Sequence, residues 1–209
     1  MSNALQTALT EGVAALNLDV SAEQQQQLLT YLTLLQRWNQ TYNLSGIKTV
    51  PEMLTKHLFD CLAVLPFVDD GPMLDIGTGA GLPGIVLAIV HPNQPIDLLD
   101  SRRKKTIFLQ HICAELGLTH TRVICQRVES YQPDTAYRTL ICRAVGTLAE
   151  VLHNVDHLWC NNTQFLAMKG QYPAVEITEL DPTFHVTCER LEIPGNIGER
   201  HLVIVDRPR

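Results

Sequence analysis

No C-x-x-C pair and no Cys/His cluster at the spacing of metal ligands occurs in this 209-residue chain. Its cysteines are scattered instead, at Cys61, Cys113, Cys125, Cys142, Cys160 and Cys188. Four of these six lie within apolar runs, where a free thiol behaves as a small hydrophobic side chain. The cysteine pattern argues against a disulfide scaffold and predicts a reduced, cytoplasmic protein that holds no metal.

Long apolar runs are also missing, and none approaches the about 18 residues that a membrane span requires. The start of the chain, Met1–Ala4, lacks the basic region followed by an apolar one that marks a secretory signal. We therefore expect no membrane segment and no export. Hydrophobic residues still make up 45% of the chain, enough at this length for one domain with an attachment.

Basic and aromatic residues are few: 16 Lys and Arg stand against 22 Asp and Glu, and aromatic residues make up 6%. The net charge of -6 argues against a nucleic-acid partner on overall charge alone. However, Arg102–Lys105 is a run of four cations, and phosphate contacts need only such a local patch. Candidates for stacking on a base are Trp38, Tyr42 and Trp159, although Trp38 lies on an apolar stripe and is expected in the core.

The most informative segment that is present is Met73–Gly84, a short apolar run followed by a glycine-rich turn. An apolar, helix-like segment, Ile85–Val90, comes directly after it. A strand, a glycine turn and a helix together lay backbone N–H groups against a ligand. Glycine is needed there because the turn takes positive φ and a Cβ would obstruct the ligand. The segment predicts a nucleotide-like cofactor site.

Two cofactors compete for this turn. Gly79–Gly84 matches G-x-G-x-x-G, the fingerprint of dinucleotide-binding oxidoreductases that use NAD. The glycines begin earlier, at Gly77, and Asp75 stands two residues before them. A carboxylate beside a pyrophosphate is unfavourable, whereas it suits the ammonium and sulfonium charges of S-adenosylmethionine (SAM). The pattern resembles the first motif of Rossmann-like SAM-dependent methyltransferases, and we favour SAM.

Asp100 supports a ligand that contains ribose. It follows the expected strand Ile96–Leu99, about 20 residues beyond the turn, where an acid accepts hydrogen bonds from ribose hydroxyls. The alternative role is to cap the following helix, but Ser101 is available for that purpose. This observation does not choose between the two cofactors.

The pattern of the chain changes near residue 67. Residues 1–66 have helical periodicity, and we interpret them as an N-terminal helical extension whose apolar stripes serve packing. The third helix of this extension is expected to start at Pro51 and stop at Pro66, with an apolar stripe of Leu54, Leu58, Cys61, Leu62 and Leu65. Residues 67–209 alternate between strands and helices, which predicts a mostly parallel, seven-stranded sheet covered on both faces. The expected strands are Met73–Ile76, Ile96–Leu99, Arg122–Cys125, Thr139–Cys142, Phe165–Met168, Val186–Ile193 and His201–Val205, the last two as an antiparallel hairpin.

Several segments together resemble one family. They are Arg37-Trp38-Asn39, Asn43-Leu44, Asp75 to Ile85, Leu99-Asp100-Ser101, Arg127-Val128-Glu129, Cys142-Arg143-Ala144, Lys169-Gly170 and Gly198 to Leu202. Over Arg37–Val205 the chain resembles the bacterial 16S ribosomal RNA guanine-N7 methyltransferase family, also called glucose-inhibited division protein B. The resemblance implies a Rossmann-like, class I SAM-dependent methyltransferase fold. It also implies 16S rRNA or the small ribosomal subunit as partner, and we expect a monomer.

The resemblance also implies residues that bind the cofactor. These, with the glycine turn and the ribose position above, are Gly77, Gly79, Leu82, Asp100, Val128, Glu129 and Arg143. Val128 and Glu129 stand where the class grips adenine. Arg143 leaves a strand end that faces the cleft, and its expected role is either to hold the methionine carboxylate or to position the substrate base. The alternatives are that Glu129 is a surface loop residue and that Arg143 forms a structural ion pair with Asp75.

Guanine N7 has a lone pair and no proton, so methyl transfer to it needs positioning and no general base. Accordingly, we name no catalytic residue. The chain lacks the Asn/Asp-Pro-Pro-aromatic motif of amine methylation, and no cysteine stands in an evident nucleophile loop. The cations that we expect to hold RNA phosphates are Arg102, Arg103, Lys104, Lys105, Lys169, Arg200 and His201.

Other functions remain open at this point. For the cations named above, the alternative is that they only balance nearby acids such as Glu199. Three alternatives exist for the function of the whole chain. It could be an NAD-dependent oxidoreductase, a non-enzymatic RNA-binding protein of the SAM fold, or a methyltransferase for a small molecule or protein.

Overall fold

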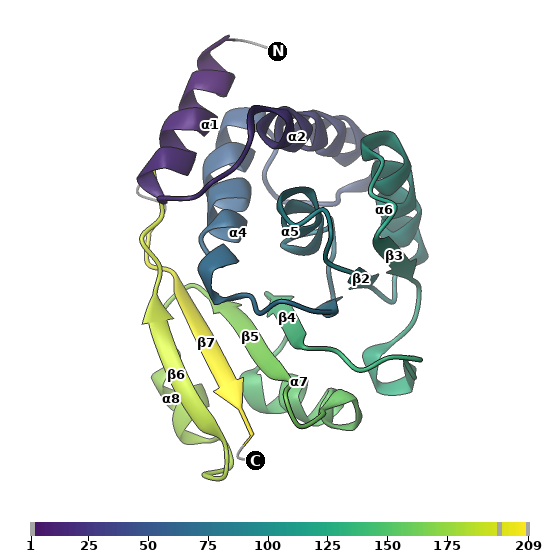
Figure 1. Cartoon of the computed structure of the whole chain (residues 1–209), viewed down its shortest axis with the longest axis vertical. Coiled ribbons are helices and arrows are strands. Elements are labelled where there is room, and N and C mark those ends of the chain that lie inside the picture. The colour runs from purple at the N-terminus through teal and green to yellow at the C-terminus, as the bar shows by residue number, and fades with distance from the viewer. Residues whose placement is uncertain (1–2, 196–197, 208–209) are drawn as a thin grey trace.

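The computed structural model describes residues 3–195 and 198–207, and its centre is a seven-stranded sheet (Figure 1). The strands are β1 (Met73–Ile76), β2 (Ile96–Leu99), β3 (Thr121–Ile124), β4 (Thr139–Arg143), β5 (Gln164–Lys169), β6 (His185–Arg190) and β7 (His201–Asp206). Each overlaps the strand predicted from the sequence, although β6 ends at Arg190, before the predicted Ile193. The mostly parallel sheet is confirmed.

The sheet has the order β3-β2-β1-β4-β5-β7-β6. Strands β1 to β5 pair in parallel, and β7 runs antiparallel to both β5 and β6. The predicted terminal hairpin is therefore confirmed; its connection includes residues 196–197, which lie outside the described residues. Because β1 has β2 on one side and β4 on the other, the winding reverses there. In open α/β sheets, ligands bind at the carboxyl ends of the strands at such a point.

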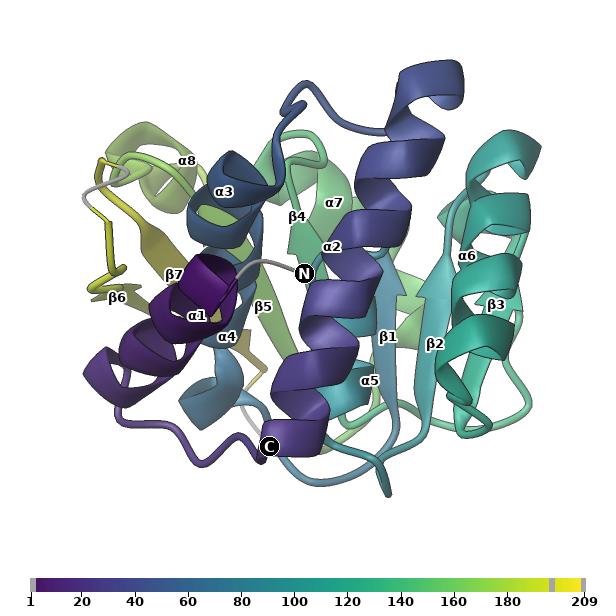
Figure 2. The same ribbon diagram turned by 90° about the horizontal axis from the view of Figure 1, so that it is seen from above.

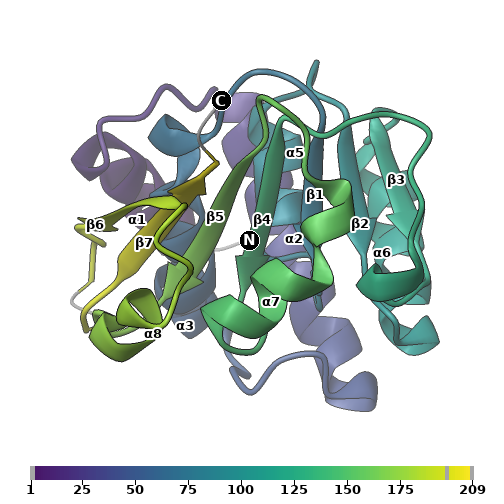
Figure 3. The ribbon, with the colours of Figure 1, turned by 90° about the horizontal axis from the view of Figure 1, so that it is seen from below.

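Helices cover both faces of the sheet. On one face lie α2 (Ala22–Tyr42), α5 (Gly84–Val90) and α6 (Arg103–Leu116), as Figure 2 shows. On the opposite face lie α7 (Leu148–Asn154) and α8 (Ala174–Thr178), seen in front of the sheet in Figure 3. Helix α1 (Asn3–Ala15) packs against α2, and Leu65–Phe67, Val128–Ser130 and Asp156–Leu158 form 3-10 turns.

The strands separate two hydrophobic clusters because successive side chains point to opposite faces. Leu74 and Ile76 of β1 belong to the cluster under α7, whereas Met73 belongs to the cluster under α2, α5 and α6. The same alternation places Asp75 on the α5 side, where its carboxylate bonds to the start of that helix. The position of this acid is therefore a consequence of strand periodicity.

Several helix ends are capped by residues of the types that favour helix termini. Ser21 and Gln24 form a capping box at the start of α2, and Thr147 and Glu150 form one at α7. Gly117 ends α6 in the left-handed conformation, with φ 67°. Within residues 3–195 and 198–207, no helix has the length and apolar character to cross a membrane.

The N-terminal helices share the core of the sheet. Leu28, Leu32 and Leu35 of α2 belong to the same buried cluster as the strands beneath them. The fully buried Tyr31 donates a hydrogen bond from its hydroxyl to the carbonyl of Ala80, at 2.8 Å. Helix α2 therefore holds the glycine turn in place, a contact that the helical periodicity of residues 1–66 did not reveal.

The third predicted helix, expected to start at Pro51 and stop at Pro66, contains a wider turn. It consists of α3 (Val50–Met53), a π-helical segment (Leu54–Phe59) and α4 (Asp60–Leu62). Its predicted apolar stripe is buried, as expected. The π turn was not predicted. Such turns occur frequently at functional sites, and this one carries His57.

Candidate functional site

The glycine turn after β1 is held from below by Asp75, which is fully buried. Its Oδ2 accepts hydrogen bonds from the Thr78 hydroxyl at 2.5 Å and from the Gly84 N–H at 2.7 Å. Gly77 and Gly79 both have φ 64°, a conformation that few side chains tolerate. The turn is thereby fixed with its backbone toward the carboxyl ends of the strands.

The sequence-based interpretation of Asp75 was wrong in one respect. We expected its carboxylate to face a cationic ligand, but the side chain lies beneath the turn and lines neither of the cavities described below. Burial raises its pKa to about 6, although the hydrogen bonds from Thr78 and Gly84 oppose that shift. The acid shapes the loop.

Gly84 packs against the strands so closely that a side chain does not fit. A Cβ there would lie 2.2 Å from Leu98 Cδ2 and 2.6 Å from Asp75 Oδ2. We expect Gly84→Ala to lower the free energy of unfolding by about 2–3 kcal/mol, measured by urea denaturation. Gly46→Ala is the control, because a Cβ there meets nothing within 4 Å. Equal stability of the two variants would contradict this reading of the turn.

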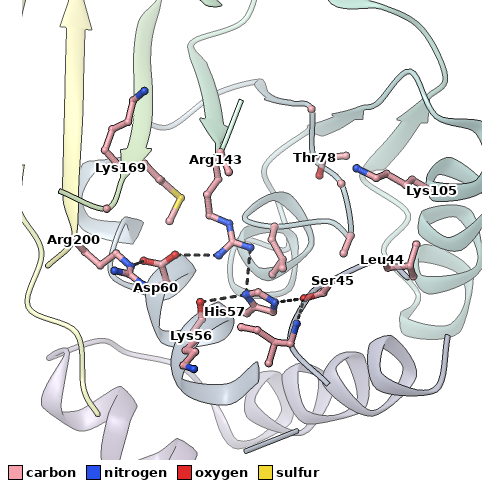
Figure 4. A pocket seen from close by; sticks show the side chains of 18 residues that line it. Leu44, Ser45, Lys56, His57, Asp60, Thr78, Lys105, Arg143, Lys169 and Arg200 are labelled. Carbon is pink, nitrogen blue, oxygen red and sulfur yellow. Dashed lines mark hydrogen bonds and ion pairs between the residues drawn. The ribbon is translucent and has the colours of Figure 1, made fainter. Parts of the chain in front are cut away.

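Two cavities open on either side of Gly77. The larger, of about 620 Å³, lies between the glycine turn, the ends of β4 and β5, and the segment from Leu44 to Asp60 (Figure 4). The smaller, of about 170 Å³, lies beside the ends of β1 and β2 and the turn after β3. Gly77 lines both cavities, so an extended ligand that crosses this residue would occupy both.

The predicted cofactor residues all lie at these cavities. The larger is lined by Gly77, Gly79, Leu82 and Arg143, and the smaller by Gly77, Asp100, Val128 and Glu129. Val128 is half-buried and Glu129 is exposed. The structure therefore brings together residues from four separate strand ends, as the class of fold requires. Their contacts with a cofactor stay a prediction.

Asp100 binds the protein itself as well as facing the smaller cavity. Its Oδ2 accepts from the Gly79 N–H at 3.0 Å and from Lys105 Nζ at 3.3 Å, and its Oδ1 accepts from the Arg102 N–H at 2.9 Å. The expectation that Ser101 caps the following helix was wrong, because the cap residue is Arg102 and it has no side-chain cap. At the start of this helix it is Asp100, and not Ser101, that accepts a hydrogen bond from the backbone N–H of Arg102.

The floor of the larger cavity is a charged triad. Asp60 lies between two arginines: its Oδ2 is 3.0 Å from Arg143 Nη1, and its Oδ1 is 3.2 Å from Arg200 Nε. These side chains are 7%, 19% and 24% exposed, respectively. The alternative predicted an ion pair between Arg143 and Asp75. Arg143 does form an ion pair, but its partner is Asp60. The triad joins the π-containing helix, β4 and the residue before β7.

His57 and Ser45 form the wall of this cavity next to the triad. His57 Nε2 is 2.7 Å from Ser45 Oγ, and its Nδ1 is 3.4 Å from Arg143 Nη2 (Figure 4). Burial and the cation of Arg143 lower the pKa of His57 to about 4, so the ring is neutral at neutral pH. Sequence reasoning missed Ser45, His57 and Asp60. The sequence signal that could have indicated them is the presence of polar residues on or beside the apolar stripe of a helix.

The predicted RNA-binding cations divide into three groups. Arg102, Arg103 and Lys104 are exposed at the start of α6. The second group lines the larger cavity but is paired with acids: Lys105 with Asp100, Lys169 with Glu176 and Arg200 with Asp60. His201 is only 7% exposed and bonds to the carbonyl of Gly170. It does not face solvent, so we leave it out of the proposed RNA surface.

The stacking candidates are partly covered. Trp38 packs against Phe108 and Tyr42, with ring centroids 5.4 Å and 5.2 Å away. Trp159 lies under the guanidinium of Arg207, 4.7 Å from its ring centroid. Among the described residues, no group of three or more His, Cys, Asp or Glu side chains could hold a metal ion. The site thus combines backbone N–H groups and cationic side chains with the carboxylates of Asp60, Asp100 and Glu129.

Solved structures with the same fold are methyltransferases. One is a SAM-dependent methyltransferase from Aquifex aeolicus (TM-score 0.57, 17% identity), which covers 74% of this chain and 92% of its own. Another is the glycopeptide N-methyltransferase MtfA in complex with SAM (TM-score 0.54, 10% identity), which covers 73% of this chain and 88% of its own. At these identities the likeness shows the fold, the Rossmann-like class I methyltransferase fold that was predicted.

Relatives of higher identity extend over almost the whole chain. A ribosomal RNA small subunit methyltransferase G from Marinobacter nauticus is 45% identical over 200 residues, 95% of this chain and 94% of its own length. One from Alteromonas mediterranea is 41% identical over 200 residues, 95% of each. The family model described as rRNA small subunit methyltransferase G matches residues 24–203. The chain therefore belongs to the rRNA small subunit methyltransferase G family.

Proposed function

We propose that this protein transfers a methyl group from SAM to N7 of a guanine in 16S ribosomal RNA. The observation that carries the proposal is family membership over residues 24–203, together with the two cavities that meet at Gly77. An rRNA substrate implies a reaction in the cytoplasm, and we propose that the chain acts as a monomer. Residues 1–66 then act as an extension that supplies one wall of the reaction cavity.

The residues around the two cavities fit this cofactor. Asp100 lines the smaller cavity, where its carboxylate would accept hydrogen bonds from the ribose, and Val128 and Glu129 would contact the adenine. Gly77 has no side chain to block a ligand that passes between the cavities. Arg143 in the larger cavity would hold the methionine carboxylate. When bound, SAM supplies a methyl group on a cationic sulfur.

The task of the protein in this reaction is positioning. The N7 lone pair of guanine carries no proton, so no side chain has to remove one. The larger cavity is lined partly by Leu44, Ile47 and Leu82, whose apolar side chains would exclude water from the reacting atoms. Arg143 and Arg200 share the charge of Asp60, which keeps these cations at the floor of the cavity.

Labelled SAM tests the proposal directly. The protein is incubated with small ribosomal subunits and with naked 16S rRNA, both from cells that lack the gene. We expect label in 16S rRNA, and reduction and strand cleavage should map it to a 7-methylguanine. A binding protein without enzymatic activity would transfer no label. Tight NADH binding without binding of S-adenosylhomocysteine, measured by calorimetry, would instead support the oxidoreductase.

The exposed cations at the start of α6 are the proposed phosphate contacts. Each of Arg102→Gln, Arg103→Gln and Lys104→Gln should reduce the slope of log affinity against log salt concentration by about 0.7–0.9, because one phosphate contact is lost. The readout is the salt dependence of binding to 16S rRNA. Arg190→Gln, which removes an exposed cation on β6, is the control and should leave the slope unchanged. Unaltered slopes in all three variants would refute these contacts.

A further inference from the structure

Ser45 is held in the wall of the larger cavity by Asn39 of α2. Asn39 Oδ1 accepts from the Ser45 N–H at 2.8 Å, and Asn39 Nδ2 donates to the Ser45 carbonyl at 2.9 Å and to the Ile47 carbonyl at 2.8 Å. Asn39 is 8% exposed. The loop that carries Ser45 is therefore rigid, and its hydroxyl has a defined place in the cavity.

The hydrogen bonds of Ser45 Oγ determine where its proton points. The Ile47 N–H donates to this oxygen at 3.1 Å, and His57 Nε2 lies 2.7 Å from it. If Nε2 carries the proton of the imidazole, both lone pairs of the hydroxyl are occupied by donors. No further partner of Ser45 Oγ occurs among the described residues, so its O–H is then free to donate into the cavity.

Two neighbours of Nδ1, Arg143 and the carbonyl of Lys56, compete to set which nitrogen of His57 carries the proton. A guanidinium has donors and no acceptor, and Arg143 Nη2 lies 3.4 Å from His57 Nδ1. The carbonyl of Lys56, 3.2 Å from Nδ1, competes for the opposite tautomer. The positive charge beside Nδ1 favours a lone pair there and the proton on Nε2. Arg143, His57 and Ser45 thus form a chain that aims the Ser45 hydroxyl.

The other side-chain donors around the cavity are charged or already committed. Thr78 donates to Asp75, Lys105 pairs with Asp100, and Lys169 pairs with Glu176. In addition, a cation beside N7 would oppose the positive charge that the base gains on methylation. The Ser45 hydroxyl is a neutral side-chain donor, and in this tautomer of His57 its proton has no partner within the described part of the chain.

We propose that the Ser45 hydroxyl, aimed by His57, recognises O6 of the target guanine. Guanine presents O6 beside N7 as an acceptor, whereas adenine presents an amino group there as a donor. A hydroxyl that can only donate accepts guanine and rejects adenine. This assignment rests on the proposed function and names the residue through which the reaction selects its base.

Kinetics of three variants test the assignment. Ser45→Ala should lower kcat/KM for unmethylated small subunits about tenfold, whereas S-adenosylhomocysteine affinity should be unchanged. Ser45→Thr keeps the hydroxyl and should retain most of the rate. Thr33→Ala, which removes an exposed hydroxyl of α2, is the control and should match the wild type. Retention of the full rate by Ser45→Ala, or equal loss in Ser45→Thr, would overturn the assignment.

A substituted base separates recognition from a loss of structure. The target guanine is replaced by 2-aminopurine, which keeps N7 but has no O6. The wild-type enzyme should be less active on this RNA than on the natural one. On the substituted RNA, Ser45→Ala should be almost as active as the wild-type enzyme, because both changes remove the same hydrogen bond. Additive losses would refute the contact. If the wild-type enzyme labels no rRNA at all, the proposed function fails instead.

The tautomer of His57 is measurable without any substrate. Nitrogen-15 NMR of the labelled protein should show Nε2 protonated and Nδ1 as the acceptor. Arg143→Gln should shift the ring toward the other tautomer, because the positive charge is lost. A ring protonated on Nδ1 in the wild-type protein would overturn the proposed chain, whatever the outcome of the activity assays.

Discussion

Replacement of Asp60 by alanine is expected to lower the free energy of unfolding by about 3 kcal/mol. The carboxylate is the shared partner of Arg143 and Arg200, and all three side chains are mostly buried. Removal of one member of a buried ion network leaves uncompensated charge, which typically costs about 3–5 kcal/mol. Here two guanidinium groups would face each other without a counter-charge. Urea denaturation of the purified variant measures the change.

Two further variants show that the effect belongs to the triad. Asp60→Asn keeps an oxygen acceptor but removes the charge. Its free energy of unfolding should therefore lie between those of the wild type and Asp60→Ala. Glu52→Ala breaks an exposed pair with Lys56 on the same helical segment and should cost less than about 1 kcal/mol. A loss in Asp60→Ala no larger than that in Glu52→Ala would show that the triad contributes little.

The fold was predictable because its signals are local. Apolar runs of strand length, the capping residues Ser21 and Thr147, and the terminal Gly117 each act within a few residues. The glycine turn also predicted a ligand site at the place where the structure has two cavities, because only backbone conformation is involved. The π turn at Leu54–Phe59 was not predictable, because hydrophobic periodicity does not distinguish one wider turn within a helix.

The proposed base-binding half of the site was not predictable from the sequence. The chain Ser45–His57–Arg143 joins a loop, a helix and a strand, and Arg143 lies 86 residues beyond His57 in the sequence. Their distances depend on the packing of α2 against α3 and on the place of β4 in the sheet, which are tertiary properties. The cations were found by type, but only the structure showed which are paired and that His201 is buried. Exposure, unlike residue type, is a property of the fold.

Asp100→Ala should weaken the binding of S-adenosylhomocysteine about 100-fold. In the proposed site its carboxylate accepts from the ribose, and hydrogen bonds to a charged group are worth about 1.5–3 kcal/mol. It also anchors the glycine turn through the Gly79 N–H, at 3.0 Å. Calorimetry measures the affinity. Glu115→Ala, which removes an exposed acid from α6, is the control and should bind like the wild type.

The two roles of Asp100 are separable because only one of them involves the ribose. A 2′,3′-dideoxy analogue of S-adenosylhomocysteine cannot donate to the carboxylate. If Asp100 binds the ribose hydroxyls, the wild-type protein should lose affinity for this analogue, and Asp100→Ala should bind both ligands about equally. If Asp100 acts only on the turn, the variant should lose the same factor for both ligands. That second pattern would remove Asp100 from the cofactor contacts and leave it as the residue that joins the glycine turn to α6.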